Sequence, residues 1–228
     1  MQFLKGHWQL FALIAVVFGL WNTPVVLPLK ILVVFLHELS HGLAAVLTGG
    51  QIEEISLSPQ QGGHAITRGG SRFVILSAGY LGSLGLGVFL LLIALRTRAD
   101  RLAMGLCGLV LLATAALYMR ALFPLAFSVL FGGAMLASAR YLSVQVNDMA
   151  LRVIGLTSVI YVPYDIFDDT IARSGLRSDA YMLANEFGGP TMLWGGIWLA
   201  LSLLVIVFCL RFGVGPRSNL RFGPQIKG

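Results

Sequence analysis

The amino-acid sequence predicts an all-α polytopic membrane protein in which residues 1–228 form a single membrane-embedded domain with a short β-hairpin. Hydrophobic residues make up 57% of the chain and charged residues only 11%. With a mean hydropathy of +0.84, this is a balance that water-soluble domains of this length do not carry. Several apolar runs have the length of a membrane-spanning helix, about 20 residues. We expect about six or seven transmembrane helices, in the runs 8–24, 27–48, 72–95, 102–119, 121–139, 147–167 and 190–210.

Two of these runs leave the number of helices open. The first, residues 8–24, lacks the strongly basic start and the small-residue cleavage site of a signal peptide, so we expect a membrane helix. Only Met119 and Arg120 separate the fourth and fifth runs, and Pro124 follows closely. This spacing indicates either a tight helical hairpin or one broken helix.

Residues 49–71 are predicted to form a β-hairpin rather than a helix. Glycine pairs bracket two short stretches in which polar and apolar residues partly alternate, a pattern typical of strands and turns. Such a hairpin could offer an edge strand to an extended peptide. A solvated connecting loop is an equally open interpretation.

The arginines predict the orientation in the bilayer. Arg96, Arg98 and Arg101 cluster in one short loop, and residues 211–228 form a basic tail without an acidic residue. Basic loops face the cytoplasm, so we expect both segments there and the 49–71 segment on the other side, together with Lys5. The net charge of +6 fits this loop bias better than a nucleic-acid partner, and none is expected.

The most informative motif is His37-Glu38-Leu39-Ser40-His41. On a helix, His37 and His41 fall on one face and can ligate one Zn²⁺, while Glu38 can reach a water at the metal. The flanking residues are almost wholly apolar, which places three ionisable groups at bilayer depth. Each would cost kilocalories unless it is paired or used. The pattern therefore favours a metal site over histidines that only satisfy the core of an ordinary helix.

Two histidines do not complete a catalytic zinc site, which ordinarily has three protein ligands. The longer motif with a third histidine is excluded, because Ala44 and Leu47 occupy its later positions. Asp165 is the acid nearest the bilayer interior in the run 147–167, so we expect Asp165 to be the third ligand. Asp168 and Asp169 remain alternatives, although interfacial positions explain them more simply.

Together these features resemble the site-2 protease (M50) family of intramembrane zinc metalloproteases, in its M50B-like branch. The resemblance rests on the motif in a membrane helix, the following hairpin, the glycine-rich stretch 77–83 and a distant aspartate. In that family two histidines and a distal aspartate bind zinc, and the glutamate is the general base. The resemblance implies these roles for His37, His41 and Glu38, and the distal position for Asp165.

The chain departs from better-known members of that family at two places. No aspartate is followed by glycine, the pair that normally carries the third ligand, and Gly79-Tyr80 stands where many members have Gly-Pro. The stretch Arg177-Ser178-Asp179-Ala180 resembles a recurrent feature of the M50B-like branch. The sequence alone assigns this stretch no role.

The resemblance and the motif imply a zinc-dependent endopeptidase that hydrolyses peptide bonds in or near transmembrane segments. Its expected partners are the lipid bilayer and a transmembrane protein substrate. Two other classes remain: a non-catalytic zinc-binding membrane scaffold or chaperone, and a small cation transporter. Glu38 argues against the scaffold, because a structural zinc site does not need a base. The absence of a visible inverted repeat argues against the transporter.

Overall fold

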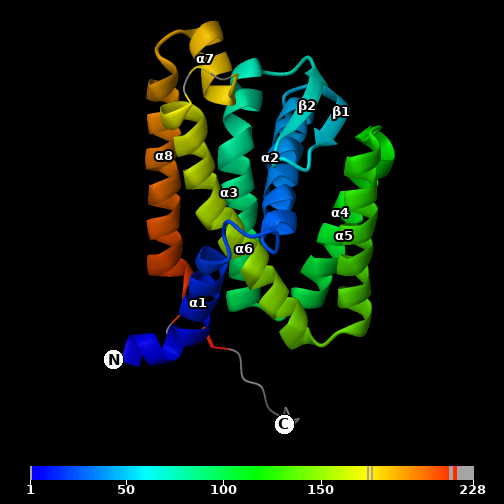
Figure 1. The fold of residues 1–228 in the computed structure, drawn as a ribbon, viewed down its shortest axis with the longest axis vertical. Coiled ribbons are helices and arrows are strands. Elements are labelled where there is room, and N and C mark those ends of the chain that lie inside the picture. Colours follow the sequence, from blue (N-terminus) through cyan, green and yellow to red (C-terminus); the bar gives the residue numbers. More distant parts are fainter. Residues whose placement is uncertain (1, 174, 176, 216–217, 220–228) are drawn as a thin grey trace.

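Helices and one β-hairpin make up the computed structural model, which describes residues 2–173, 175, 177–215 and 218–219. Figure 1 shows long helices side by side, with the hairpin against one of them. The elements are α1 (Gln2–Gly19), α2 (Leu27–Leu47), β1 (Gln51–Leu57), β2 (Gly63–Arg68), α3 (Arg72–Arg96), α4 (Asp100–Tyr118), α5 (Leu122–Tyr141), α6 (Val144–Phe167) with a π-helical extension (Asp168–Ala172), α7 (Asp179–Phe187) and α8 (Thr191–Phe208) with a second π-turn (Cys209–Gly213).

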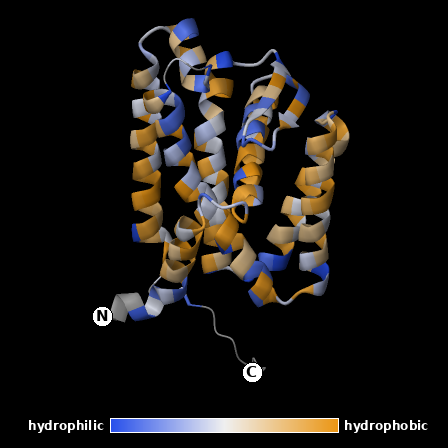
Figure 2. Cartoon of the chain, viewed as in Figure 1, coloured by the Kyte–Doolittle hydropathy of each residue, from blue (hydrophilic) through white to orange (hydrophobic). Residues whose placement is uncertain are grey.

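Six helices of the described chain are long and apolar enough to cross a membrane. They are Leu27–Leu47, Arg72–Arg96, Asp100–Tyr118, Leu122–Tyr141, Val144–Ala172 and Thr191–Gly213. Figure 2 shows apolar residues along these helices, most completely on α8. The predicted membrane architecture is thus confirmed, and the fourth and fifth runs are two helices joined by a short turn rather than one broken helix.

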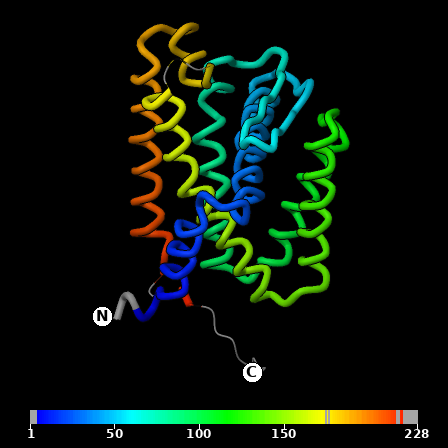
Figure 3. The backbone as a smooth tube through the Cα atoms, viewed as in Figure 1, coloured from blue at the N-terminus to red at the C-terminus, as the bar shows by residue number. Residues whose placement is uncertain are grey.

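The first predicted run is helical, but α1 is not among the six candidate spans. Figure 3 shows that α1 ends partway along the bundle and that the chain turns there before α2 continues toward the far end. The prediction that Lys5 lies opposite the arginine loop is wrong. The backbone N–H of Ser218 donates to the Gly6 carbonyl over 2.9 Å, and the Asn219 side-chain amide donates to the Lys5 backbone carbonyl over 2.7 Å. At the same end, the Arg96 guanidinium donates to the Gly213 carbonyl over 2.6 Å. Most of the predicted basic tail, residues 216–217 and 220–228, lies outside the described residues.

The predicted β-hairpin is confirmed. Strands β1 and β2 pair antiparallel, with an irregularity between Ile52 and Glu54. The hairpin lies along α2, where the side chain of Ile52 comes so close to Gly42 that a Cβ there would lie 2.7 Å from it. Strand β1 also contacts α4 and α5, whereas the main contacts of β2 are with β1 and α2. The outer edge of β2 is therefore the edge that these helices leave open.

Small residues allow α3 to pack closely against the motif helix α2 on one side and against α6 on the other. A Cβ on Gly82 would lie 2.5 Å from Ser40 Oγ, and one on Gly87 would lie 2.3 Å from the Ser158 side chain. The Ser158 hydroxyl also donates to the Ser83 carbonyl over 2.8 Å. Small residues and interhelical hydrogen bonds are the usual means of helix association in lipid.

Candidate metal centre

Three potential ligands converge on one point between α2 and α7. Asp179 Oδ2 lies 3.0 Å from His37 Nε2 and 3.1 Å from His41 Nε2. All three ligand atoms lie within 4.8 Å of one another. The imidazole rings of His37 and His41 are 4.7 Å apart and nearly perpendicular, as expected for an i, i+4 pair on one helical face. Two imidazole nitrogens and one carboxylate oxygen are a typical donor set for catalytic zinc, which also needs an open coordination position.

The short helix α7 carries Asp179 to the histidines. The Ser178 side chain caps α7 by accepting a hydrogen bond from the Tyr181 backbone N–H over 3.3 Å, and Asp179 follows in the first turn. Ala180 and Leu183 are fully buried on the inner face of the helix. Capping and burial fix the orientation of α7, so the Asp179 carboxylate is held in place rather than sampling solvent.

The protonation pattern of the three groups favours a cation between them. His41 Nδ1 lies 2.7 Å from the Ile75 carbonyl oxygen, and a carbonyl can only accept, so this nitrogen carries the proton. In the neutral imidazole, Nε2 then presents a lone pair to the Asp179 carboxylate. Burial alone would raise the pKa of the Asp179 carboxyl, but positive charge on His41 and His37 and their hydrogen bonds hold that pKa well below its usual value. A proton or a metal ion between these acceptors accounts for their convergence, and the donor set fits zinc.

Glu38 lies beside this group with its carboxylate uncommitted. The side chain is buried, and no hydrogen bond to its carboxylate occurs in the described part of the chain. The end of the hairpin turn covers it: a Cβ on Gly63 would lie 2.7 Å from Glu38 Oε1. Because only glycine fits there, strand β2 begins directly against the carboxylate. Glu38 keeps its acceptor capacity for a water molecule or a substrate proton.

Gly79 on α3 makes room for the histidines. A Cβ at this position would lie 2.4 Å from His37 Nε2 and 2.6 Å from His41 Cε1. The next residue, Tyr80, packs its ring against His37 with centroids 4.6 Å apart, and its hydroxyl donates to Asp169 over 2.8 Å. The glycine-rich stretch identified in the sequence therefore lines the candidate centre.

The structure brings together His37, Glu38 and His41 but places Asp179, not Asp165, beside the histidines. Asp165 is partly buried near the end of α6 and is not a member of the three-residue group. Asp168 and Asp169 both pair with Arg173, at 2.5 and 2.9 Å. Asp179 escaped prediction because α7 is too short and too polar to form an apolar run. The signal that could have identified it was the Arg177–Ala180 stretch, where a serine cap precedes an aspartate.

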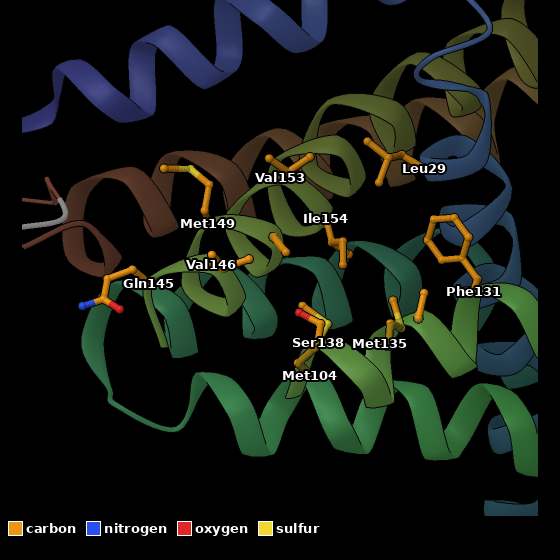
Figure 4. A pocket seen from close by; sticks show the side chains of 12 residues that line it. Leu29, Met104, Phe131, Met135, Ser138, Gln145, Val146, Met149, Val153 and Ile154 are labelled. Atoms are coloured by element: carbon orange, nitrogen blue, oxygen red, sulfur yellow. The ribbon is translucent and has the colours of Figure 1, made fainter. Parts of the chain in front are cut away.

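A large cavity elsewhere in the protein is lined by no described residue of the types that ligate zinc or act as a base. It measures about 530 Å³ and lies between α4, α5, α6 and the start of α2 (Figure 4). Its walls carry apolar side chains such as Phe131, Met135 and Ile154, and the polar exceptions are Ser138 and Gln145. None of its described lining residues is a histidine, a cysteine or an acid, so it is not a candidate active site.

Comparison with protein-family models adds an observation that is independent of the site geometry. The family model described as Peptidase M50B-like matches residues 10–209, which include His37, His41 and Asp179. No curated protein and no solved structure matches the chain.

Proposed function

Because the chain belongs to the Peptidase M50B-like family, we propose that this integral membrane protein is a zinc-dependent endopeptidase that hydrolyses peptide bonds in or near transmembrane segments. The observation that carries the proposal is the convergence of His37, His41 and Asp179 on one point, next to the uncommitted Glu38 carboxylate. Metal-dependent hydrolysis requires a base beside an open metal site, whereas a structural metal site does not need one.

In this mechanism His37, His41 and Asp179 would hold the zinc. When bound there, the ion would supply Lewis acidity toward the scissile carbonyl and a low pKa for an adjacent water. Glu38 takes the proton from the attacking water and delivers it to the leaving amine. The Ile75 carbonyl keeps His41 in the tautomer whose Nε2 faces the centre, which is the usual role of an outer partner to a ligating histidine.

The proposed substrate is a membrane-spanning segment that unwinds near the site. A transmembrane helix hides its amides and carbonyls in its own i to i−4 hydrogen bonds, so the scissile bond becomes accessible only after local opening. We expect Gly, Pro or Asn near the cleavage point, where opening costs least. The open edge of β2, which starts against Glu38, is suited to pair with the extended stretch.

The proposal is tested by measuring cleavage of a single-spanning substrate by the purified protein in detergent. Glu38→Gln keeps the shape of the side chain and removes the base. We expect about one zinc per chain to be retained while turnover falls roughly 100-fold or more, the range expected for loss of a general base. Metal content and product formation are measured on the same preparations. Unchanged turnover in Glu38→Gln would exclude Glu38 as the base, and zinc binding without any cleavage by the wild-type protein would favour the scaffold.

A further inference from the structure

A second cavity, with polar walls, lies between the α1–α2 loop and the tip of the hairpin. It measures about 270 Å³, and its walls include Trp21, Asn22, Thr23, Lys30 and Gln61. The loop that forms one wall lies partway along the bundle rather than at its end (Figure 1). Non-helical backbone at membrane depth is tolerated only where it is buried in protein or lines a polar cavity. This cavity gives the loop such a setting, as a space that water or a ligand can fill.

Among the described residues, the only charged side chain lining this cavity is Lys30. It is 8% exposed, and its ammonium lies 4.4 Å from the centre of the Trp21 ring. No carboxylate pairs with it anywhere in the described chain. A cation–π contact offsets only part of what an unpaired charge costs within a bilayer. A membrane-embedded lysine without a counter-ion points to a ligand that supplies the negative charge.

Two further features make the cavity a donor site for an anion. Helix α2 begins there at Leu27, and its N-cap residue Val26 provides no side-chain cap, so the positive end of the helix dipole is open to a ligand. Gln61 occupies the hairpin tip with a φ of +65°, a conformation that non-glycine residues rarely adopt. Its side-chain amide has no hydrogen-bond partner among the described residues. Donors thus surround the space, and no acid of the described chain lines it.

The cavity lies along the same face of α2 as the candidate metal centre. Lys30 precedes His37 by seven residues and His41 by eleven, which places them on one helical face at about 10 and 16 Å along the axis. The hairpin follows that interval, because Gly63 lies against both Glu38 and Val34, and Gln61 reaches the cavity with Lys30. An extended polypeptide covers the distance in about three to five residues.

We propose that this cavity is a subsite for a substrate carboxylate three to five residues from the scissile bond, an inference that rests on the proposed peptidase activity. Lys30 and the start of α2 bind the negative charge, and Gln61 donates a hydrogen bond to it. Two sources supply this chemistry: an acidic side chain within the substrate, or the free C-terminal carboxylate of a cleaved chain.

The first test measures cleavage of single-spanning substrates that carry Asp or Asn at each position from two to seven residues on either side of the cut. For the wild-type protein we expect Asp to be preferred about tenfold at one position within the three-to-five interval, as for a charge-assisted hydrogen bond. Lys30→Met should abolish that preference, Lys30→Arg should keep most of it, and Lys30→Glu should transfer it to a substrate with Lys there. Equal cleavage of Asp and Asn substrates at every position would exclude an acidic side chain as the ligand of the subsite while leaving the peptidase intact.

A binding measurement separates the two proposals. A fluorescent apolar peptide is titrated against Glu38→Gln protein, with Asp or Asn at the preferred position and with a free or amidated C-terminus. Weaker binding of the Asn peptide identifies the side-chain source, and weaker binding of the amidated peptide identifies the terminal one. In each case the difference should vanish in the Lys30→Met, Glu38→Gln double variant. Binding that depends on Lys30, without cleavage by the wild-type protein, would retain the subsite and reject the peptidase. Binding that changes neither with the Asp-to-Asn substitution in the peptide nor with amidation of its C-terminus would reject the subsite.

Discussion

At the scale of single residues, the candidate centre is explained by acceptors that would repel one another without a cation. The carboxylate of Asp179 faces the Nε2 atoms of His37 and His41 at 3.0 and 3.1 Å. The backbone of Ile75 already occupies the other nitrogen of His41. Such an arrangement is stable when a proton or a metal ion lies between the acceptors, and the donor set fits zinc.

The ligand assignment leads to a first prediction at this scale. Asp179→Ala should lower zinc affinity by more than the roughly 10- to 100-fold that loss of an outer partner costs, because it removes one of three ligands. Asp165→Ala serves as the matched control, since its carboxylate lies outside the group. Zinc per chain is measured after dialysis against a graded series of chelator concentrations. A larger loss of zinc in Asp165→Ala than in Asp179→Ala would restore the assignment made from the sequence.

At the scale of elements, the centre depends on how closely α3 approaches α2. Gly79 provides that approach, because its missing Cβ would lie 2.4 Å from His37 Nε2. A Cβ on Gly85, on the same helix, would meet no atom of the described residues within 4 Å. The structure therefore requires the absence of a side chain at position 79 but not at position 85.

Gly79 and Gly85 allow a test substitution to be compared with a matched control on the same helix. We expect Gly79→Ala to push His37 out of position, to weaken zinc binding and to cost about 1–3 kcal/mol of stability, the usual penalty of overpacking. Gly85→Ala should leave zinc content and stability near those of the wild-type protein. Zinc content and the thermal unfolding midpoint in detergent report both effects. Equal behaviour of the two variants would show that the close approach of Gly79 to His37 does not control the site.

The β-hairpin is the second element whose role can be tested. If substrate pairs with the open edge of β2, a proline on that strand should slow cleavage by removing a backbone donor. Ile66 is 45% exposed on β2, so Ile66→Pro is the informative change and Ile66→Val, which keeps the donor, is its control. We expect cleavage to fall in the proline variant alone, with zinc retained in both. Full activity of Ile66→Pro would favour a substrate that reaches Glu38 without strand pairing.

At the scale of the whole molecule, the arrangement of α1 changes the predicted topology. Because α1 stops partway along the bundle and α2 continues in the same direction, the two helices together cross the length of the bundle only once (Figure 3). The N-terminal segment therefore lies at the same end as Ser218 and the Arg96–Arg101 loop. This arrangement places Lys5 at the same end as the Arg96–Arg101 cluster, as the positive-inside rule expects, and supports the proposal that this end is cytoplasmic.

Labelling of single cysteines tests this topology. In a background without Cys107 and Cys209, Lys5→Cys and Thr97→Cys should react with a membrane-impermeant reagent only from the cytoplasmic side. Ser71→Cys, which precedes α3 at the other end of the bundle, should react only from the opposite side. Modification is quantified by mass shift in sealed vesicles of both orientations. Labelling of Lys5→Cys and Thr97→Cys from different sides would mean that α1 crosses the bilayer by itself.

The sequence by itself determined the parts of this protein that depend on local patterns. The length of an apolar run sets a membrane helix, and glycine pairs around alternating residues set a hairpin, so the six spans and β1–β2 were predictable. The i, i+4 spacing of His37 and His41 likewise follows from helix geometry alone. These features need only neighbours along the chain.

Only the tertiary structure decided which distant residues meet. Asp179 follows His37 by 142 positions and reaches it because α7 packs against α3 and α8, contacts that leave no periodic signal in a nine-residue helix. Lys30 and Gln61 line one cavity because the hairpin folds back along α2 and α1 stops short. Such placements depend on packing between elements, where burial and close approach determine the outcome and local propensity does not.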